Sequence, residues 1–214
     1  MSFQGRTIVL RVDEQSLDGT TLIADLGFLQ QHAVRPIVVA PHTELARTFV
    51  GVMNRTSDAA VGLRGADAGM IPAAGAAIGA VQTRLLETLT RSGYVPVIEP
   101  IAFGLGGTEV GLPPDEIARA IAEATDAMRI LFFDATGGVG VDELTPAEAL
   151  ELADSGSLTP ALETAMRAAA YGVRGGVEAA QIIDGRIAHA SIVEFVTARH
   201  IGTQVTGTVF IASP

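Results

Sequence analysis

The chain has 214 residues, 24 acidic and 14 basic side chains, and a formal net charge of −10. All basic residues are arginine and cysteine is absent, which excludes disulfides, cysteine metal sites and thiolate nucleophiles. The acidic balance argues against nucleic acids and anionic membranes as partners. Because no signal peptide and no apolar run near the ~20 residues of a membrane span is present, we expect a cytoplasmic protein.

Strand and helix patterns alternate through the first half of the chain. Continuous β-branched runs predict buried strands, and apolar residues spaced three and four apart predict helices. Leu22, Leu26 and Leu29 follow the helical spacing, and Thr43 is the predicted N-cap of the next helix. The elements predicted in this half are strands at 7–12, 35–40, 59–63 and 94–98 and helices at 21–31, 43–55 and 81–92, with none assigned to 65–79.

The alternation resumes after the glycine-rich segment 101–114, which we predict to be a loop. Asp115 and Glu116 favour a helix start, because acidic side chains stabilise helix N-termini. Thr145 and Glu148 have the spacing of a capping box. The elements predicted in this half are helices at 115–127, after Thr145, at 159–171 and at 189–197, strands at 129–133 and 177–184, and a last strand or strand pair at 202–211. This repeated β–α–β order predicts an α/β protein whose mainly parallel sheet carries helices on both faces.

Several segments match a known family in sequence as well as in order. They are VGVMNRTSDAAVGLRGADAGMI (50–71), LLETLTRSGYVPVIEPIAFG (85–104), ELTPAEALEL (143–152), GVEAAQIIDGRIAHASIVEF (176–195) and HIGT (200–203). These segments resemble the amino-acid kinase family, and the N-acetylglutamate kinases within it most closely.

The resemblance implies a three-layer α/β/α sandwich with an open sheet, forming a single domain over 1–214. It implies an amino-terminal lobe for the acyl amino acid over 1–114 and a nucleotide lobe over 115–214. The family transfers the γ-phosphoryl group of ATP to a carboxylate, so ATP and Mg²⁺ are the cofactors that the resemblance suggests.

Both phosphate cradles of the family are altered in this chain. The family ends its first strand in a lysine and two glycines, which neutralise and approach phosphate. In this chain Arg11 precedes Asp13 and Glu14, so Arg11 is either a catalytic remnant or a strand-end arginine paired with Asp13 or another acid. The family ends its second strand in a histidine and three glycines. In this chain Pro41, which has no N–H, precedes His42, which we expect to be a capping or surface residue.

The remaining catalytic positions are altered as well. Asp115 falls where the family places an aspartate that orients two catalytic lysines, although after Pro114 it is also a good helix start. Ala161 stands where the resemblance places the second lysine. The family's lid, which precedes the segment beginning at Leu45, is missing, and the region 65–81 is shortened. We therefore expect a reduced acyl-amino-acid site.

A glycine-rich turn follows the strand predicted at 129–133. Asp134, Gly137 and Gly138 resemble the family turn that packs on ATP, so these three residues are candidates for nucleotide binding. The alternative is an ordinary strand-to-loop turn, which is common in α/β sheets.

The carboxy-terminal block keeps the family motif best. His189, Glu194 and Gly202 lie in a region that contributes to an arginine-binding pocket in feedback-regulated relatives, so they are candidates for effector binding. The alternative is that the block forms only the core of the second lobe. The histidines have no metal-ligand spacing with nearby acids, and we predict no metal site.

Three functions from different classes follow. The first is a catalytically degenerate, ligand-binding or regulatory subunit linked to arginine metabolism, with arginine or a nucleotide as effector and a related kinase or synthase as an oligomeric partner. The second is a divergent active kinase in which Arg11 acts with Arg167 or Arg174 around Mg–ATP. The third is a scaffold or storage subunit of a homo-oligomer.

Overall fold

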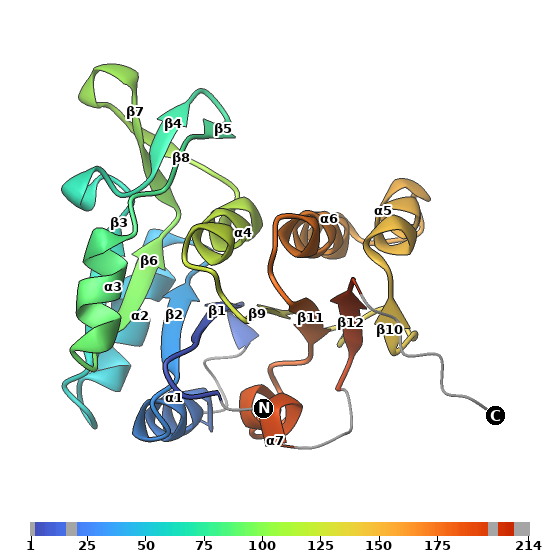
Figure 1. The fold of residues 1–214 in the computed structure, drawn as a ribbon, viewed down its shortest axis with the longest axis horizontal. Helices are drawn as coiled ribbons and strands as arrows, with labels where there is room; N and C mark the ends of the chain where they lie inside the picture. Colours follow the sequence, from blue (N-terminus) through green and yellow to red (C-terminus); the bar gives the residue numbers. More distant parts are fainter. Residues whose placement is uncertain (1–2, 16–20, 197–200, 208–214) are drawn as a thin grey trace.

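The computed structural model describes residues 3–15, 21–196 and 201–207. An eight-stranded sheet runs through the molecule in the order β10-β12-β11-β9-β1-β2-β6-β3 (Figure 1). Its pairs are parallel apart from β11 and β12, which are antiparallel. The strands are β1 (Thr7–Arg11), β2 (Arg35–Val39), β3 (Ala60–Arg64), β6 (Val95–Glu99), β9 (Arg129–Phe133), β10 (Glu143–Leu144), β11 (Ala179–Ile183) and β12 (Thr203–Thr206).

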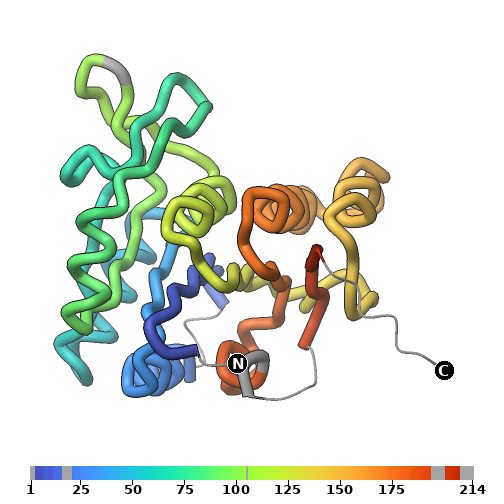
Figure 2. The backbone as a smooth tube through the Cα atoms, viewed as in Figure 1, coloured from blue at the N-terminus to red at the C-terminus, as the bar shows by residue number. Residues whose placement is uncertain are grey.

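Helices cover both faces of this sheet, as the chain trace also shows (Figure 2). One face carries α3 (Arg84–Arg91), α4 (Pro114–Ala124), α5 (Pro146–Asp154) and α6 (Pro160–Arg174). The other face carries α1 (Thr21–Gln31), α2 (Thr43–Met53) and α7 (Ala190–Val196). The predicted three-layer α/β/α sandwich with a mainly parallel sheet is therefore confirmed.

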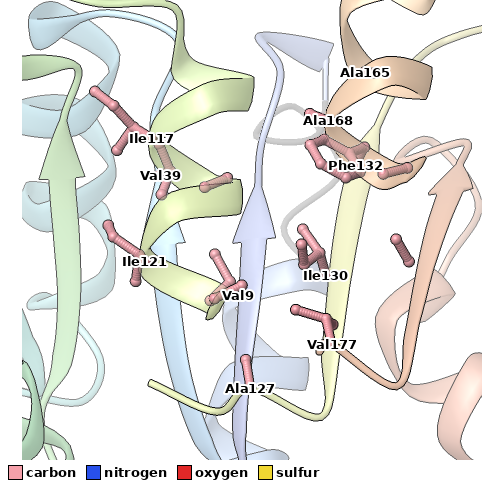
Figure 3. Packing of buried hydrophobic residues seen from close by; sticks show 14 of the residues in the cluster. Val9, Val39, Ile117, Ile121, Ala127, Ile130, Phe132, Ala165, Ala168 and Val177 are labelled. Carbon is pink, nitrogen blue, oxygen red and sulfur yellow. The ribbon is translucent and has the colours of Figure 1, made fainter. Parts of the chain in front are cut away.

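The larger core lies between the sheet and the helices α4 and α6 (Figure 3). Because strand side chains alternate between faces, Val9 faces this core while Ile8 and Leu10 face the opposite one. Small residues on α6 let that helix approach the sheet closely. A Cβ at Gly172 would lie 2.8 Å from the Ile130 side chain, which explains a glycine inside a long helix.

A second, four-stranded sheet lies beyond β3 and β6, at the top of Figure 1, in the order β5-β4-β7-β8. Its strands are β4 (Pro72–Ala74), β5 (Ala77–Ile78), β7 (Ile101–Gly104) and β8 (Glu109–Gly111). The prediction of a loop over 101–114 is therefore wrong, because β7 and β8 form an antiparallel hairpin there. Frequent glycines and very short strands hide the alternating pattern that would have predicted it.

Local signals set the element boundaries. The helix predicted at 21–31 is confirmed as α1. Thr43, however, does not cap α2, because the Nδ1 atom of His42 accepts a hydrogen bond from the backbone N–H of Leu45 at 3.2 Å. The strand predicted at 202–211 is β12, and residues 208–211 lie outside the described part of the chain.

The capping box at the start of α5 is confirmed. The backbone N–H of Thr145 donates to the Glu148 carboxylate at 2.8 Å, and the Thr145 hydroxyl accepts from the Glu148 N–H at 3.3 Å. The bonds from Thr145 lower the pKa of Glu148 below its ordinary value. Among the helices in the described ranges, none is long and apolar enough to span a membrane.

Candidate functional site at the carboxyl edge of the sheet

The strand order reverses beside β1, which lies between β2 and β9 in the sheet. The early strands β2, β6 and β3 lie on one side of β1, and the later strands β9, β11, β12 and β10 lie on the other. Open α/β sheets bind ligands outside the carboxyl ends of the strands at such a reversal. Arg11 ends β1 and Asp134 follows β9, so both sequence candidates lie at this edge.

Arg11 is buried and paired with Asp115 across this reversal. The Arg11 Nε atom lies 2.5 Å from Asp115 Oδ1, and the two residues are only 7% and 6% exposed. Neither atom has an aligned hydrogen bond among the described residues, so the contact is a charge pair. The Arg11 Nη1 atom also donates to the Phe133 carbonyl at 2.9 Å. The guanidinium group is therefore committed to protein groups on α4 and β9.

Thr164 occupies the other side of the Asp115 carboxylate. Its hydroxyl, on α6, lies 2.8 Å from Asp115 Oδ2 and can donate there or to the Ala161 carbonyl at 2.9 Å. Sequence reasoning missed Thr164, because a single threonine inside a helical pattern carries no signal of its own. Asp115 thus joins β1 to α6, and the neighbour of its second carboxylate oxygen is a neutral hydroxyl.

The ends of β1 and β2 carry acids and a capping histidine. Asp13 is half-buried and Glu14 is exposed. The Nδ1 atom of His42 accepts the capping hydrogen bond, so its Nε2 atom carries the proton that faces Glu14 Oε1 at 3.2 Å. The expectation that His42 is a capping residue is confirmed, and its ring is turned toward a carboxylate.

The glycine-rich turn after β9 packs tightly against β12 and the chain leading into it. Gly138 has φ of 113°, and a Cβ there would lie 2.5 Å from the Thr203 hydroxyl. Gly202 has φ of 94°, and a Cβ added there would lie 2.0 Å from the Ile182 carbonyl oxygen. The Thr203 hydroxyl accepts from the Val139 N–H at 2.9 Å and donates to the Val141 carbonyl at 2.7 Å. Close backbone packing is thus a sufficient reason for glycine at both positions.

The other two turn candidates have protein contacts of their own. A Cβ at Gly137 would lie 3.2 Å from Cβ of Asp184. The Asp134 carboxylate accepts hydrogen bonds from the backbone N–H and the hydroxyl of Thr136, at 2.9 and 2.5 Å.

Arg186 closes the same edge from the loop after β11. Its side chain donates to both oxygens of Asp184, at 2.9 and 2.7 Å, and to the Ala135 carbonyl at 2.7 Å. These bonds lower the pKa of Asp184, against the opposing effect of burial. The same carboxylate raises the pKa of Arg186, and the charge of Asp13 adds to that effect. Arg186 is thus a cation held among acids of its own chain.

His189 connects the carboxy-terminal block to α1. Its Nδ1 atom lies 2.6 Å from Oδ1 of Asp25, and the Ser191 hydroxyl donates to Oδ2 of Asp25 at 2.6 Å. Asp25 is 1% exposed and lies on the apolar face of α1, and this polar residue among leucines is a signal that could have indicated the contact. Glu194 belongs to α7, but its side chain lies outside the described part of the structure.

The two other arginines considered for catalysis lie away from this site. Arg167 is paired with Asp154 and Glu163, at 2.6 and 3.0 Å, on the side of α6 that faces α5. Arg174 ends α6, about 15 Å along the helix axis from Thr164. Neither side chain is positioned beside Arg11 and Asp115.

The residues at this edge do not fit the phosphates of ATP. A phosphate site needs unpaired cations and backbone N–H groups. In this chain Arg11 is committed to Asp115, Pro41 offers no N–H, and Asp13 and Glu14 add negative charge at the end of β1. In the described ranges, no group of three or more histidine, aspartate or glutamate side chains could hold a metal ion.

We expect Asp115→Ala to destabilise the protein by about 3–5 kcal/mol, because it leaves the buried Arg11 charge unpaired. The double variant Arg11→Met/Asp115→Leu should lose much less, because it removes both charges. Urea unfolding of the two variants measures this. The exposed pair Arg64–Glu109, at 2.7 Å, is the control, and Glu109→Ala should cost at most about 1 kcal/mol. Equal losses for Asp115→Ala and Glu109→Ala would contradict the buried pairing.

Gly202→Ala should destabilise the protein by about 2–5 kcal/mol, through its left-handed backbone and the clash with Ile182. Gly140 is the matched control, because it has φ of 76° but no atom within 4 Å of an added Cβ. Gly140→Ala should therefore cost only about 1–2 kcal/mol. Unfolding of both variants in urea tests the difference, and an equal loss would show that packing does not require glycine at 202.

Comparison with known proteins agrees with this fold. No family model matches the chain. An acetylglutamate kinase from Symbiobacterium thermophilum is 34% identical, over 95% of this chain and 92% of the relative. One from Erythrobacter litoralis is 35% identical over 58% of this chain, and this match spans only 44% of the relative's length.

Among solved structures, N-acetylglutamate synthase from Neisseria gonorrhoeae superimposes with a TM-score of 0.79. It is 20% identical, over 97% of this chain and 61% of that chain, and was solved with coenzyme A and N-acetyl-glutamate. A second structure of that synthase, solved with coenzyme A and L-arginine, gives the same TM-score at 18% identity, over 97% of this chain and 63% of that chain. These likenesses support the fold, and the Symbiobacterium relative shows the family. The chain belongs to the acetylglutamate kinase family.

Proposed function

We propose that this member of the acetylglutamate kinase family does not transfer phosphate and acts instead as a ligand-binding or regulatory subunit linked to arginine metabolism. The observation that carries the proposal is that the buried Asp115 holds one cation, Arg11, and one neutral hydroxyl, from Thr164, whereas the family's aspartate orients two lysines. Phosphoryl transfer depends on cations directed at the transferring group. Arg11 is directed at Asp115 and at the Phe133 carbonyl.

The surroundings of the pair support the same conclusion. Thr164 and Ala161 bring no positive charge to the other side of Asp115. Two further carboxylates, Asp13 and Glu14, follow Arg11 and would repel phosphate oxygens. Loss of one stabilising cation can slow phosphoryl transfer by about 10³-fold or more. Several such losses together favour a degenerate site over a divergent active kinase.

The amino-terminal half supports the loss of the acyl-amino-acid site. β2 ends at Val39 and α2 already begins at Thr43. That short connection leaves no room for the lid that the family resemblance implies at this point. With no lid, a bound acyl amino acid would lack the arginine that holds its carboxylate in the family.

The carboxy-terminal block supports an effector site. The Nδ1 atom of His189 is committed to Asp25, but the His189 side chain is 56% exposed, so its ring edge can meet a ligand. We propose that L-arginine binds beside His189, Glu194 and Gly202, as the motif match implies. The structure of the Neisseria synthase with L-arginine is consistent with an effector of this chemistry in this fold.

A coupled assay of ADP release tests the catalytic half of the proposal. With Mg–ATP and N-acetylglutamate, the chain should release ADP at least about 10³-fold more slowly than the Symbiobacterium acetylglutamate kinase, assayed as the positive control. ADP release that depends on N-acetylglutamate at a comparable rate would contradict the proposal.

Thermal unfolding with L-arginine tests the effector half with the same preparation. A ligand that binds only the folded state raises the Tm. L-arginine should raise the Tm of the wild type and have a smaller effect on His189→Gln. An unchanged Tm in the wild type would argue against this effector site.

A further inference from the structure

A groove lies at the opposite, amino-terminal edge of the sheet, away from the site described above. Two adjoining cavities of about 290 and 260 Å³ make it up, and they share Gly5, Arg35, Thr90 and Arg91 as lining residues. The larger cavity also contacts the carboxy-terminal end of α4 at Ala124. A groove of this size suits a small organic ligand.

Three of the charged side chains that line this cavity, Arg6, Glu87 and Arg91, are already paired. Arg6 lies 2.5 Å from Glu178, and Arg91 lies 3.0 Å from Glu87. The charge that the groove presents to a ligand therefore comes from its other ionisable side chains.

The remaining charges are Arg35 and Asp126, which both line the larger cavity. Arg35 is half-buried and begins β2, whereas Asp126 is exposed and follows α4 with φ of 47°. Within the described ranges, neither side chain makes a hydrogen bond or an ion pair with the protein. One cavity thus presents a free cation and a free carboxylate that do not pair with each other.

We propose that this groove binds a zwitterionic α-amino acid, with its carboxylate on Arg35 and its ammonium group on Asp126. The end of α4 supports this orientation, because helix C-termini carry partial negative charge and favour cations. Asp126 and that helix end oppose a purely anionic ligand. Arg35 opposes a purely cationic one. A ligand that carries both charges satisfies both sides, and the site is independent of the function proposed for the carboxyl edge.

Thermal unfolding of the full chain in the presence of L-alanine tests the proposal. Acetate, which carries only the carboxylate, and methylammonium, which carries only the ammonium group, are the control ligands at the same ionic strength. L-alanine should raise the Tm by about 3–6 °C at about ten times its dissociation constant. Acetate and methylammonium should each produce a smaller shift.

Arg35→Gln and Asp126→Asn should each weaken L-alanine binding by about tenfold or more. Asparagine tolerates the left-handed backbone at 126, so the second variant keeps the turn. Arg84→Gln is the matched control, since Arg84 lies on α3 beside a different cavity, and it should keep the full shift. The proposal is overturned if L-alanine leaves the wild-type Tm unchanged. It is also overturned if acetate alone reproduces the shift and Asp126→Asn does not reduce it.

Discussion

The buried contact between Arg11 and Asp115 organises the centre of this molecule. It joins β1, the strand beside which the sheet order reverses, to the start of α4, and through Thr164 it also fixes α6. An unpaired charge in the protein interior strongly lowers the free energy of unfolding. Each residue of the pair is therefore tolerated in the core because the other neutralises it. The interaction lies at the carboxyl edge of the sheet, beside the strand where the sheet order reverses.

Around this pair, several side chains at the carboxyl edge of the sheet are held by contacts within the chain. Arg186 is held by Asp184 and the turn after β9, and the Thr203 hydroxyl holds the chain over 139–141. Glycines at 138 and 202 permit these close approaches. A family architecture is thereby retained by interactions within the chain, without the need for a phosphate ligand at its centre.

Local and periodic features could be predicted from the sequence, whereas pairings between distant residues could not. The apolar spacing of α1 and the capping box at Thr145 depend on residues within one or two turns, and both are confirmed. The hairpin over 101–111 was missed because its strands are too short to show alternation. Residue patterns alone offered no partner for Arg11 beyond a nearby acid; only the family resemblance placed Asp115 beside it, because the two residues meet through the packing of α4 on β1.

Titration calorimetry with Mg–ATP, in the presence and absence of N-acetylglutamate, tests most directly whether Arg11 is withdrawn from phosphate chemistry. If the guanidinium group stays with Asp115, the titration should give no saturable heat at ATP concentrations up to the millimolar range. Saturable binding with a micromolar Kd, lost in Arg11→Met, would show that Arg11 is available to the nucleotide and would contradict its withdrawal into the pair with Asp115.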